Sequence, residues 1–256
     1  MKKSLILMFI SIFMLIGCSP FSGDKETKNL VANGLSSKAI YKLADEKISA
    51  GSIGQAIKHY KTIIESYPGS KYAIQARLDI AYNLYKQKKY NLSILELNKF
   101  IEKYPNLPST PYAYYLKGVV AEAVSTSILD NLITDSAQRD VASVRDAYSY
   151  FMDLIDTFPN SKYSEDAIKK LPSLRATLAR HEFYVALYYT GVGSHIAAIN
   201  RSKFIIENYP NSSSIPDSLH LMAFNYDEIN APQLAIDARK ILTSSYPDYS
   251  PNYSVD

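Results

Sequence analysis

Apolar side chains recur along this chain at spacings of three and four residues, the pattern of an amphipathic α-helix that buries one face. The stretches 37–68 and 70–105 each hold two such runs, separated by a turn at Gly51 in the first and at Tyr90-Asn91 in the second. The leading runs have their buried stripes at Ile40, Leu43, Ala44 and Ile48, and then at Ile74, Leu78, Ala81 and Leu84. Each stretch is therefore predicted to form a pair of antiparallel helices.

A small residue, a second small residue twelve positions later and a proline twelve beyond that recur four times in register. The sets are Ala44/Ala56/Pro68, Ala81/Ser93/Pro105, Ala186/Ala198/Pro210 and Ala223/Ala235/Pro247, and an interrupted fifth copy ends at Phe158-Pro159. Two helices that cross closely need small side chains at the crossing, and a proline ends the second helix before the next pair begins. The sequence thus predicts an all-α superhelix of five helix-pair repeats, a scaffold for contacts.

Two repeats are longer than the others. Successive prolines are 37 residues apart from Pro68 to Pro105, but 54 apart from Pro105 to Pro159 and 51 apart from there to Pro210. In the third repeat the small residues are Gly118 and Ala147, which leaves an insert over about 123–139, either an ordered loop or a bent helix extension. The extra residues between Pro159 and Pro210 fall at about 167–180 and predict a lengthened helix that bends at Pro172.

These spacings divide the body of the chain. Repeats 1–3 are expected over 37–159 and repeats 4 and 5 over 160–247, while the tail 248–256 has no apolar face and is predicted to be frayed. Ser52-Ile53-Gly54-Gln55 has the form of a capping box. Ser70, Ser161 and Ser212 each follow a proline by two residues, where a helix N-cap is expected.

The N-terminus has the features of a bacterial lipoprotein leader. Met1-Lys2-Lys3 is followed by thirteen uncharged residues and then by Gly17-Cys18, the only cysteine. An apolar run this short indicates a secretory signal, since about 20 apolar residues are needed to span a bilayer. Leu15-Ile16-Gly17-Cys18 resembles the lipobox, which implies removal of residues 1–17 and acylation of Cys18; the alternative is a signal peptide that ends at a chance cysteine. Ser19 after the cysteine implies, by the enterobacterial sorting rule, delivery to the outer membrane, and residues 18–36 are predicted to be a flexible tether.

Composition narrows the function. Without Lys2 and Lys3 the 28 basic side chains fall to 26 against 25 acidic ones, a balance that argues against nucleic acid as the main ligand. The four histidines, His59, His181, His195 and His220, are scattered singly, with no pair at the spacing of a helical metal site. The sequence also shows no recognisable set of catalytic residues and no phosphate-binding loop. The chain is therefore predicted to be neither an enzyme nor a holder of any cofactor beyond the covalent lipid.

The spacing of small, aromatic and proline residues is that of tetratricopeptide repeats, and the chain from Cys18 to about Pro247 resembles the BamD (ComL-like) family of outer-membrane lipoproteins. The resembling stretches are Tyr67–Tyr72, Tyr104-Pro105, Asp140–Ala147, Phe158–Tyr163, Ala179–Glu182, Val185-Ala186, Tyr188-Tyr189 and Asn200-Arg201. The resemblance implies a subunit of the β-barrel assembly machine (BAM complex) that helps to fold and insert outer-membrane β-barrel proteins, anchored by lipid to the periplasmic face of the outer membrane.

The resemblance also implies two binding surfaces. The C-terminal repeats would hold the last POTRA domain of BamA, the barrel-forming subunit, beside other BAM subunits, and Arg201, next to Asn200, matches the family arginine that meets an acidic residue of that partner. The N-terminal repeats would receive the C-terminal strand of unfolded outer-membrane proteins. For Arg201 the alternative interpretation is a solvated surface charge.

Positions that project from each repeat into its concave face can be counted from the first small residue, at three before, one after and four after it. In repeats 1–3 they include Tyr41, Tyr82, Tyr85 and Tyr115, which predicts an aromatic groove for client strands, with packing within the chain as the alternative. In repeats 4 and 5 they are Phe183, Leu187 and Thr190, and then His220, Phe224 and Asp227, without a tyrosine cluster. The two ends are therefore expected to differ in partner.

Two other functions compete with this interpretation. One is a repeat lipoprotein that organises peptidoglycan or secretion components, and the other is an α-superhelical enzyme that acts on peptidoglycan. Recovery of BamA with the purified protein favours barrel assembly, whereas turnover of purified sacculi would establish the enzyme.

Overall fold

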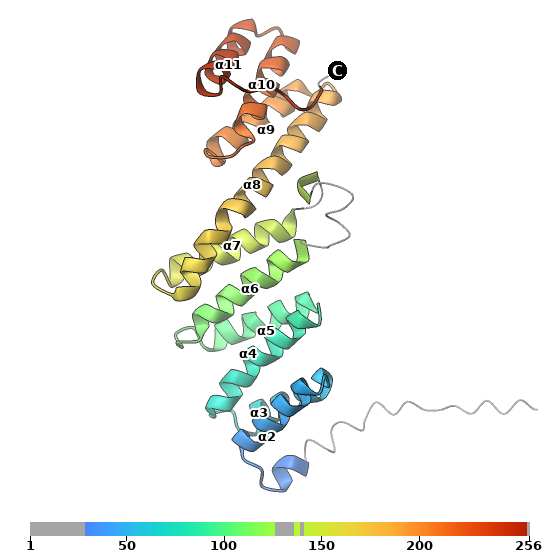
Figure 1. Ribbon diagram of the computed structural model, residues 1–256, viewed down its shortest axis with the longest axis vertical. Coiled ribbons are helices and arrows are strands. Elements are labelled where there is room, and N and C mark those ends of the chain that lie inside the picture. The colour runs from blue at the N-terminus through green and yellow to red at the C-terminus, as the bar shows by residue number, and fades with distance from the viewer. Residues whose placement is uncertain (1–28, 126–135, 139–140, 255–256) are drawn as a thin grey trace, which may run out of the picture. The chain divides into compact units, whose positions relative to one another are not determined.

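The computed structural model describes residues 29–125, 136–138 and 141–254 (Figure 1). A short helical stretch lies at 29–32. It is followed by α2 (Ser37–Ser49), α3 (Ile53–Ser66), α4 (Lys71–Lys86), α5 (Tyr90–Lys103), α6 (Thr110–Ser125), α7 (Ala142–Thr157), α8 (Lys162–Gly191), α9 (His195–Asn208), α10 (Ile215–Glu228) and α11 (Pro232–Ser245), with a 3-10 helix, η2, at Ser136–Gln138. No strand occurs among the described residues. The prediction of an all-α protein is confirmed for this part of the chain.

The chain divides into two compact units, one up to Ala76 and one from Arg77 onward. In the first unit α2 packs against α3. In the second unit α6 packs against α7, α8 against α9, and α10 against α11. These neighbours in sequence are the predicted helix pairs, and most of the predicted insert between α6 and α7 lies outside the described residues.

The small residues lie buried at the helix crossings, as the spacing predicts. The buried small residues are Ala44, Ala56, Ala81, Ser93, Gly118, Ala147, Ala186, Ala198, Ala223 and Ala235. At Gly118 an added Cβ would lie 2.4 Å from Cε1 of Phe151, so only glycine lets α6 approach α7 this closely. Ser93 on α5 donates its hydroxyl hydrogen to the carbonyl oxygen of Ala81 on α4 at 2.7 Å, so the serine bonds across the same close crossing.

An aromatic residue before proline ends the second helix of each pair. Tyr67, Tyr104, Phe158, Tyr209 and Tyr246 are the C-cap residues, each with φ between −137 and −128° and ψ between 54 and 66°. Each donates its backbone N–H to the carbonyl four residues earlier. The following proline has no N–H and excludes its predecessor from the α region, so the helix stops there.

The serine caps are confirmed in part. Ser161 accepts a hydrogen bond from the backbone N–H of Tyr163, and Ser70 from that of Tyr72. Ser212 accepts from Ser214, but helix α10 begins only at Ile215. The capping box at Ser52 is wrong: its side chain makes no cap bond, because ψ at Ser52 is 55°, outside the extended range that directs a capping side chain toward the helix.

Helix α8 is the predicted lengthened helix and contains Pro172 in its interior. Its first half packs on α6 and α7, and its second half packs on α9 and α10. This one helix therefore contacts both the third repeat and the C-terminal repeats.

The predicted fraying of the tail is wrong over residues 248–254. Tyr249 and Tyr253 pack against the hydrophobic cluster that contains Phe183 and Leu219. Both hydroxyls donate to Asp217, Tyr249 to its carboxylate at 2.8 Å and Tyr253 to its carbonyl oxygen at 3.0 Å. The tail has no apolar stripe of its own, but two of its aromatic rings pack against the C-terminal repeats and hold it in place.

Candidate partner-binding surfaces

Arg201 lies on α9 and is paired within the chain. Its Nη1 donates to Oε2 of Glu182 on α8 at 2.8 Å. The Glu182 side chain is 10% exposed, whereas that of Arg201 is 44% exposed. The guanidinium therefore compensates a buried carboxylate, while the Arg201 side chain as a whole remains partly exposed and has further donors beside the one that Glu182 uses.

Asn200 precedes Arg201 and is exposed. It lines a shallow pocket of about 500 Å³ at the turn between α8 and α9, together with Ile196 and Ile229. Beneath this turn His195 bonds Asn225 at 2.9 Å, and Asn225 donates to Thr190 Oγ1 at 2.8 Å. The network ties the start of α9, the helix that carries Asn200 and Arg201, to α8 and α10.

A second cleft, of about 630 Å³, lies between α7, the first half of α8 and the turn before α10. Its wall is largely apolar and includes Met152, Ile168 and Pro172, while Arg175 at the same cleft donates to the carbonyl oxygen of Asn208 at 3.0 Å. Tyr209 also lines it, and burial, followed by the nearby Glu182 carboxylate, raises the pKa of the Tyr209 hydroxyl. The cleft thus adjoins the Glu182–Arg201 pair.

Sequence reasoning missed this cleft. Its only signal was the presence of exposed apolar residues, such as Ile168, on the lengthened helix.

In the first unit Tyr41 on α2 is half-buried between two other rings. Its centroid lies 5.5 Å from that of Tyr60 and 5.3 Å from that of Tyr72. The Tyr60 hydroxyl donates to the Asp45 carboxylate at 2.8 Å. Tyr41 is therefore part of an aromatic cluster with a carboxylate beside it.

In the second unit Tyr82 and Tyr85 lie on α4, with ring centroids 6.2 Å apart. Tyr82 is 42% exposed, so its ring is open to a ligand. Burial, with Tyr82, Tyr163 and Asp79 nearby, raises the pKa of the Tyr112 hydroxyl on α6 to about 12. Tyr82 and Tyr85 of α4 thus form a ring pair, of which Tyr82 is the exposed member.

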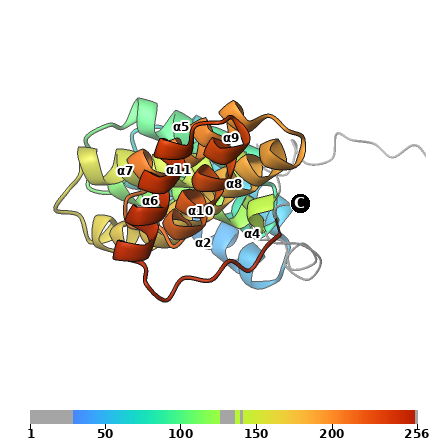
Figure 2. The ribbon, with the colours of Figure 1, turned by 90° about the horizontal axis from the view of Figure 1, so that it is seen from above.

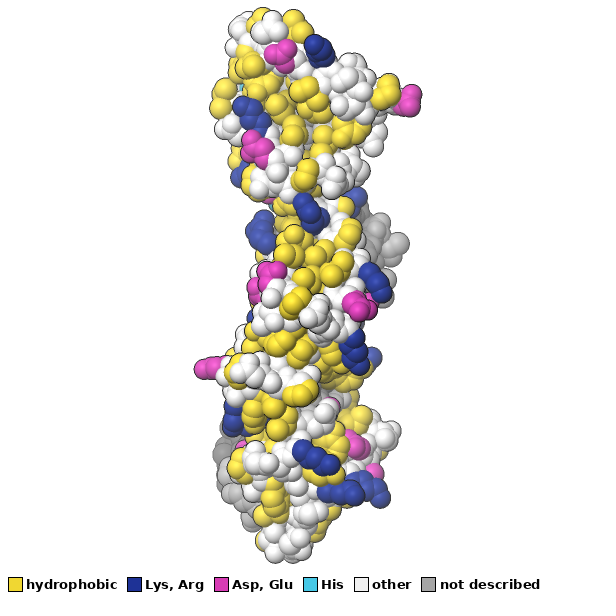
Figure 3. Space-filling model, turned by 90° about the vertical axis from the view of Figure 1, so that its left-hand side faces the viewer, with side chains coloured by type: hydrophobic (Ala, Val, Ile, Leu, Met, Phe, Trp, Pro, Cys, Tyr) yellow, Lys and Arg dark blue, Asp and Glu magenta, His cyan; other side chains and the backbone are white. Residues whose placement is uncertain are grey.

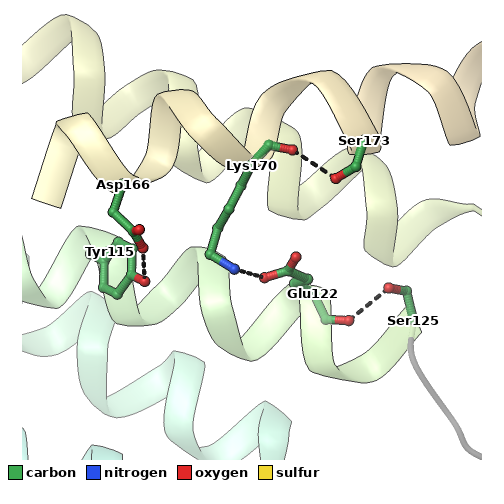
Figure 4. Close-up of polar contacts among 6 residues, drawn as sticks. All are labelled: Tyr115, Glu122, Ser125, Asp166, Lys170 and Ser173. Atoms are coloured by element: carbon green, nitrogen blue, oxygen red, sulfur yellow. Dashed lines mark hydrogen bonds and ion pairs between the residues drawn. The ribbon is translucent and has the colours of Figure 1, made fainter.

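Tyr115 is used inside the protein (Figure 4). Its hydroxyl donates to the Asp166 carboxylate on α8, and its ring lies 5.5 Å from that of Tyr163. About two turns further along α6, Glu122 pairs with Lys170 at 2.9 Å. Burial first, and then the bond to Asp166, raises the pKa of the Tyr115 hydroxyl. The first half of α8 therefore covers groove positions of the third repeat that the position count treats as open.

Other features bear on function class. Basic and acidic side chains are interspersed with apolar ones on the face drawn in Figure 3. Among the described residues, no group of three His, Cys, Asp or Glu side chains is placed to hold a metal ion. Within the same residues no helix combines the length and the apolar character that crossing a membrane requires. Cys18 and the leader lie outside the described residues.

Paired helices with small residues at their crossings define a class: an α-helical repeat protein. Residues 34–242 match the family described as YfiO, outer membrane lipoprotein. Over 96% of this chain and 92% of the relative, 32% of residues are identical to the outer membrane protein assembly factor BamD of Neisseria gonorrhoeae. The BamD of Haemophilus influenzae is also 32% identical, over 95% of this chain and 90% of the relative.

The chain belongs to this family of outer-membrane lipoproteins, the BamD family of outer membrane protein assembly factors. The family resemblance predicted from the sequence is thereby confirmed, and so is the prediction of a non-catalytic protein, since the family consists of assembly factors. Among solved structures, the TPR2AB domain of yeast Sti1 in its pHSP90 complex is 13% identical, with a TM-score of 0.42 over 83% of this chain and 78% of that one.

Proposed function

We propose that this protein is a lipid-anchored subunit of the β-barrel assembly machine that faces the periplasm. Its C-terminal repeats hold the last POTRA domain of BamA, and its N-terminal repeats receive unfolded outer-membrane proteins. The observation that carries the proposal is the match to relatives named outer membrane protein assembly factors over 96% of the chain. The exposed charges and tyrosines supply surfaces of suitable chemistry.

The partner contact is assigned to Arg201 and Asn200. An acidic residue of BamA reaches the exposed part of the guanidinium while Glu182 holds the other side, so the arginine bridges two carboxylates. The apolar cleft around Ile168 and Tyr209 extends this contact beyond a single ion pair. A bridging arginine needs its buried partner for orientation and its open donors for binding.

Co-purification from detergent-extracted membranes tests the assignment. Arg201→Gln is expected to reduce BamA recovery at least about tenfold, the effect of losing roughly 1.4 kcal/mol of binding free energy. Lys203→Gln, on the same exposed helix, is the matched control and should leave recovery unchanged. If Arg201→Gln recovers BamA as the parent does, this contact is refuted. If cell-wall enzymes co-purify in place of BamA, barrel assembly itself is refuted.

Client binding is assigned to the tyrosines of the N-terminal repeats, Tyr41, Tyr82 and Tyr85. A photoreactive side chain at position 82 should crosslink to an unfolded β-barrel protein, because this ring is exposed. The matched position is 115, where the hydroxyl is bonded to Asp166, and it should crosslink far less. Equal yields at the two positions would show that crosslinking does not report an aromatic groove.

The lipid anchor is assigned to Cys18. Cys18→Ala should leave the precursor uncleaved by lipoprotein signal peptidase and unlabelled by radioactive palmitate. A processed, labelled Cys18→Ala protein would contradict the assignment.

A further inference from the structure

The C-terminal tail occupies a defined surface of the last two repeats. After α11 the chain passes alongside α10 toward the end of α8, without helix or strand (Figures 1 and 2). The Tyr253 ring packs edge-on against Phe183 of α8 at 5.0 Å. The His220 ring of α10 lies 5.9 Å from the Tyr249 ring and 5.8 Å from that of Tyr253. Two tyrosines four positions apart thus enclose one histidine.

The hydrogen bonds at this surface are specific in direction. The one hydroxyl hydrogen of Tyr253 goes to the carbonyl oxygen of Asp217, so Nδ1 of His220, 2.9 Å away, is the donor to the Tyr253 oxygen. Tyr249 donates to the Asp217 carboxylate at 2.8 Å. That carboxylate has no ion-pair partner among the described residues, so a phenol hydroxyl is the donor that it uses.

This surface lies on the first helices of the last two repeats, α8 and α10. Phe183 and His220 each stand three residues before the first small residue of their repeat, Ala186 and Ala223, so they take equivalent positions on the two helices. The tail therefore lies across equivalent positions of two neighbouring repeats, with its aromatic rings as the anchors.

We propose that the surface of α8 and α10 under the tail is a binding site for an extended segment with two tyrosines four residues apart, and that the tail occupies it in cis. A segment of a partner with this chemistry binds when the tail leaves. The proposal is separate from the Arg201 contact and from the client tyrosines of the N-terminal repeats. The C-terminal tail then competes with the partner segment for this surface.

The tether sets how strongly the tail competes. A short flexible connection gives an attached ligand an effective concentration of about millimolar. For a free peptide that makes the same contacts, the apparent dissociation constant is multiplied by the ratio of protein with a docked tail to protein with an undocked tail. The intact protein should therefore bind such a peptide weakly, and a protein with an undocked tail should bind it well.

Fluorescence anisotropy with a labelled synthetic peptide of residues 246–256 tests this. The full chain with Tyr249→Ala/Tyr253→Ala keeps every helix but loses both anchors, and it should bind the peptide at least about tenfold more tightly than the parent. The control Ser250→Ala/Asn252→Ala changes two exposed residues of the same tail and should behave as the parent. Adding His220→Ala to the anchor variant should abolish the gain.

Equal peptide affinity of the parent and the anchor variant, with unchanged helical circular dichroism, overturns the proposal. A second measurement covers the case in which the anchor variant unfolds. With 3-fluorotyrosine at position 253 of the otherwise unaltered chain, millimolar peptide should move the fluorine resonance to its solvent-exposed position. A resonance that stays in place under excess peptide also overturns the proposal.

Discussion

Glu182 on α8 and Arg201 on α9 are joined at 2.8 Å, and the carboxylate is the more deeply buried of the two. The arginine proposed to bind a partner is thus also the counter-charge of a buried carboxylate. Any substitution of Arg201 acts on the stability of the fold as well as on its surface.

Removal of Arg201 should therefore destabilise the protein. Arg201→Gln leaves the buried carboxylate without its charged donor and should cost about 1–3 kcal/mol in the free energy of unfolding. The added substitution Glu182→Gln removes the stranded charge and should restore much of the loss. Urea unfolding followed by circular dichroism measures both, and additive losses in the double variant would contradict the coupling.

Gly118→Ala should destabilise the third repeat by about 1–3 kcal/mol, because the new methyl group would meet the Phe151 ring at 2.4 Å. This penalty exceeds the gain of up to about 1 kcal/mol from replacing glycine within a helix. Phe151→Leu in the same chain should relieve the clash. Thermal unfolding of the single and double variants decides the matter, and a stabilised Gly118→Ala protein would show that α6 and α7 pack less closely.

Asn225→Ala should cost about 2–4 kcal/mol, since it removes a fully buried amide, takes one of its two hydrogen bonds from the Thr190 hydroxyl and leaves His195 Nδ1 without its acceptor. The matched control is Asn200→Ala on the exposed face of α9, which should change stability by less than about 0.5 kcal/mol. Hydrogen exchange of the amides in α10 reports the difference. Equal exchange rates in the two variants would refute a stabilising role for the network.

Stability of the C-terminal repeats should fall on mild acidification. Burial first lowers the pKa of His220 from its usual value of 6.5, so the unfolded state binds this proton more readily. The contribution is complete above pH 6.5 and is lost as the pH falls through the lower folded value. Burial raises the pKa of Asp217 from 3.8, which gives the opposite slope: stability is lost as the pH rises through that raised value.

Hydrogen exchange of the amides in α10, compared at pH 7.5 and at about pH 5.5 after correction for intrinsic rates, measures the effect of His220. In His220→Gln the same comparison should show a smaller loss. An undiminished loss in that variant would assign the pH dependence to another group.

Helix ends and crossings could be predicted from sequence because their causes are local. The proline after Tyr67 or Phe158 excludes that residue from the α region, so the helix ends there, and a small residue such as Ala44 permits a close crossing. Pro172 inside α8 shows that a proline by itself does not stop every helix. The failure at Ser52 has a local cause as well, since a capping side chain needs an extended backbone angle that residue type alone does not specify.

Contacts between distant residues set the limit of prediction for the binding surfaces. Tyr115 projects as a groove residue by position, yet its acceptor, Asp166, lies 51 residues later on the extended part of α8. The sequence indicated the extra length of α8 but not the helices against which it packs. Nothing in the sequence indicated that Glu182 would pair with Arg201. The hydrogen-bond partners of the tail, Asp217 and His220, likewise lie more than 30 residues before Tyr249 and Tyr253, respectively.

Helix α8 spans 30 residues, about 45 Å at the rise of an α-helix. Its first half carries Lys170 against Glu122, and its second half carries Glu182 against Arg201. Pro172 in its interior lacks the N–H that would close its turn. The third repeat and the C-terminal repeats therefore share one continuous helix, without any loop in between.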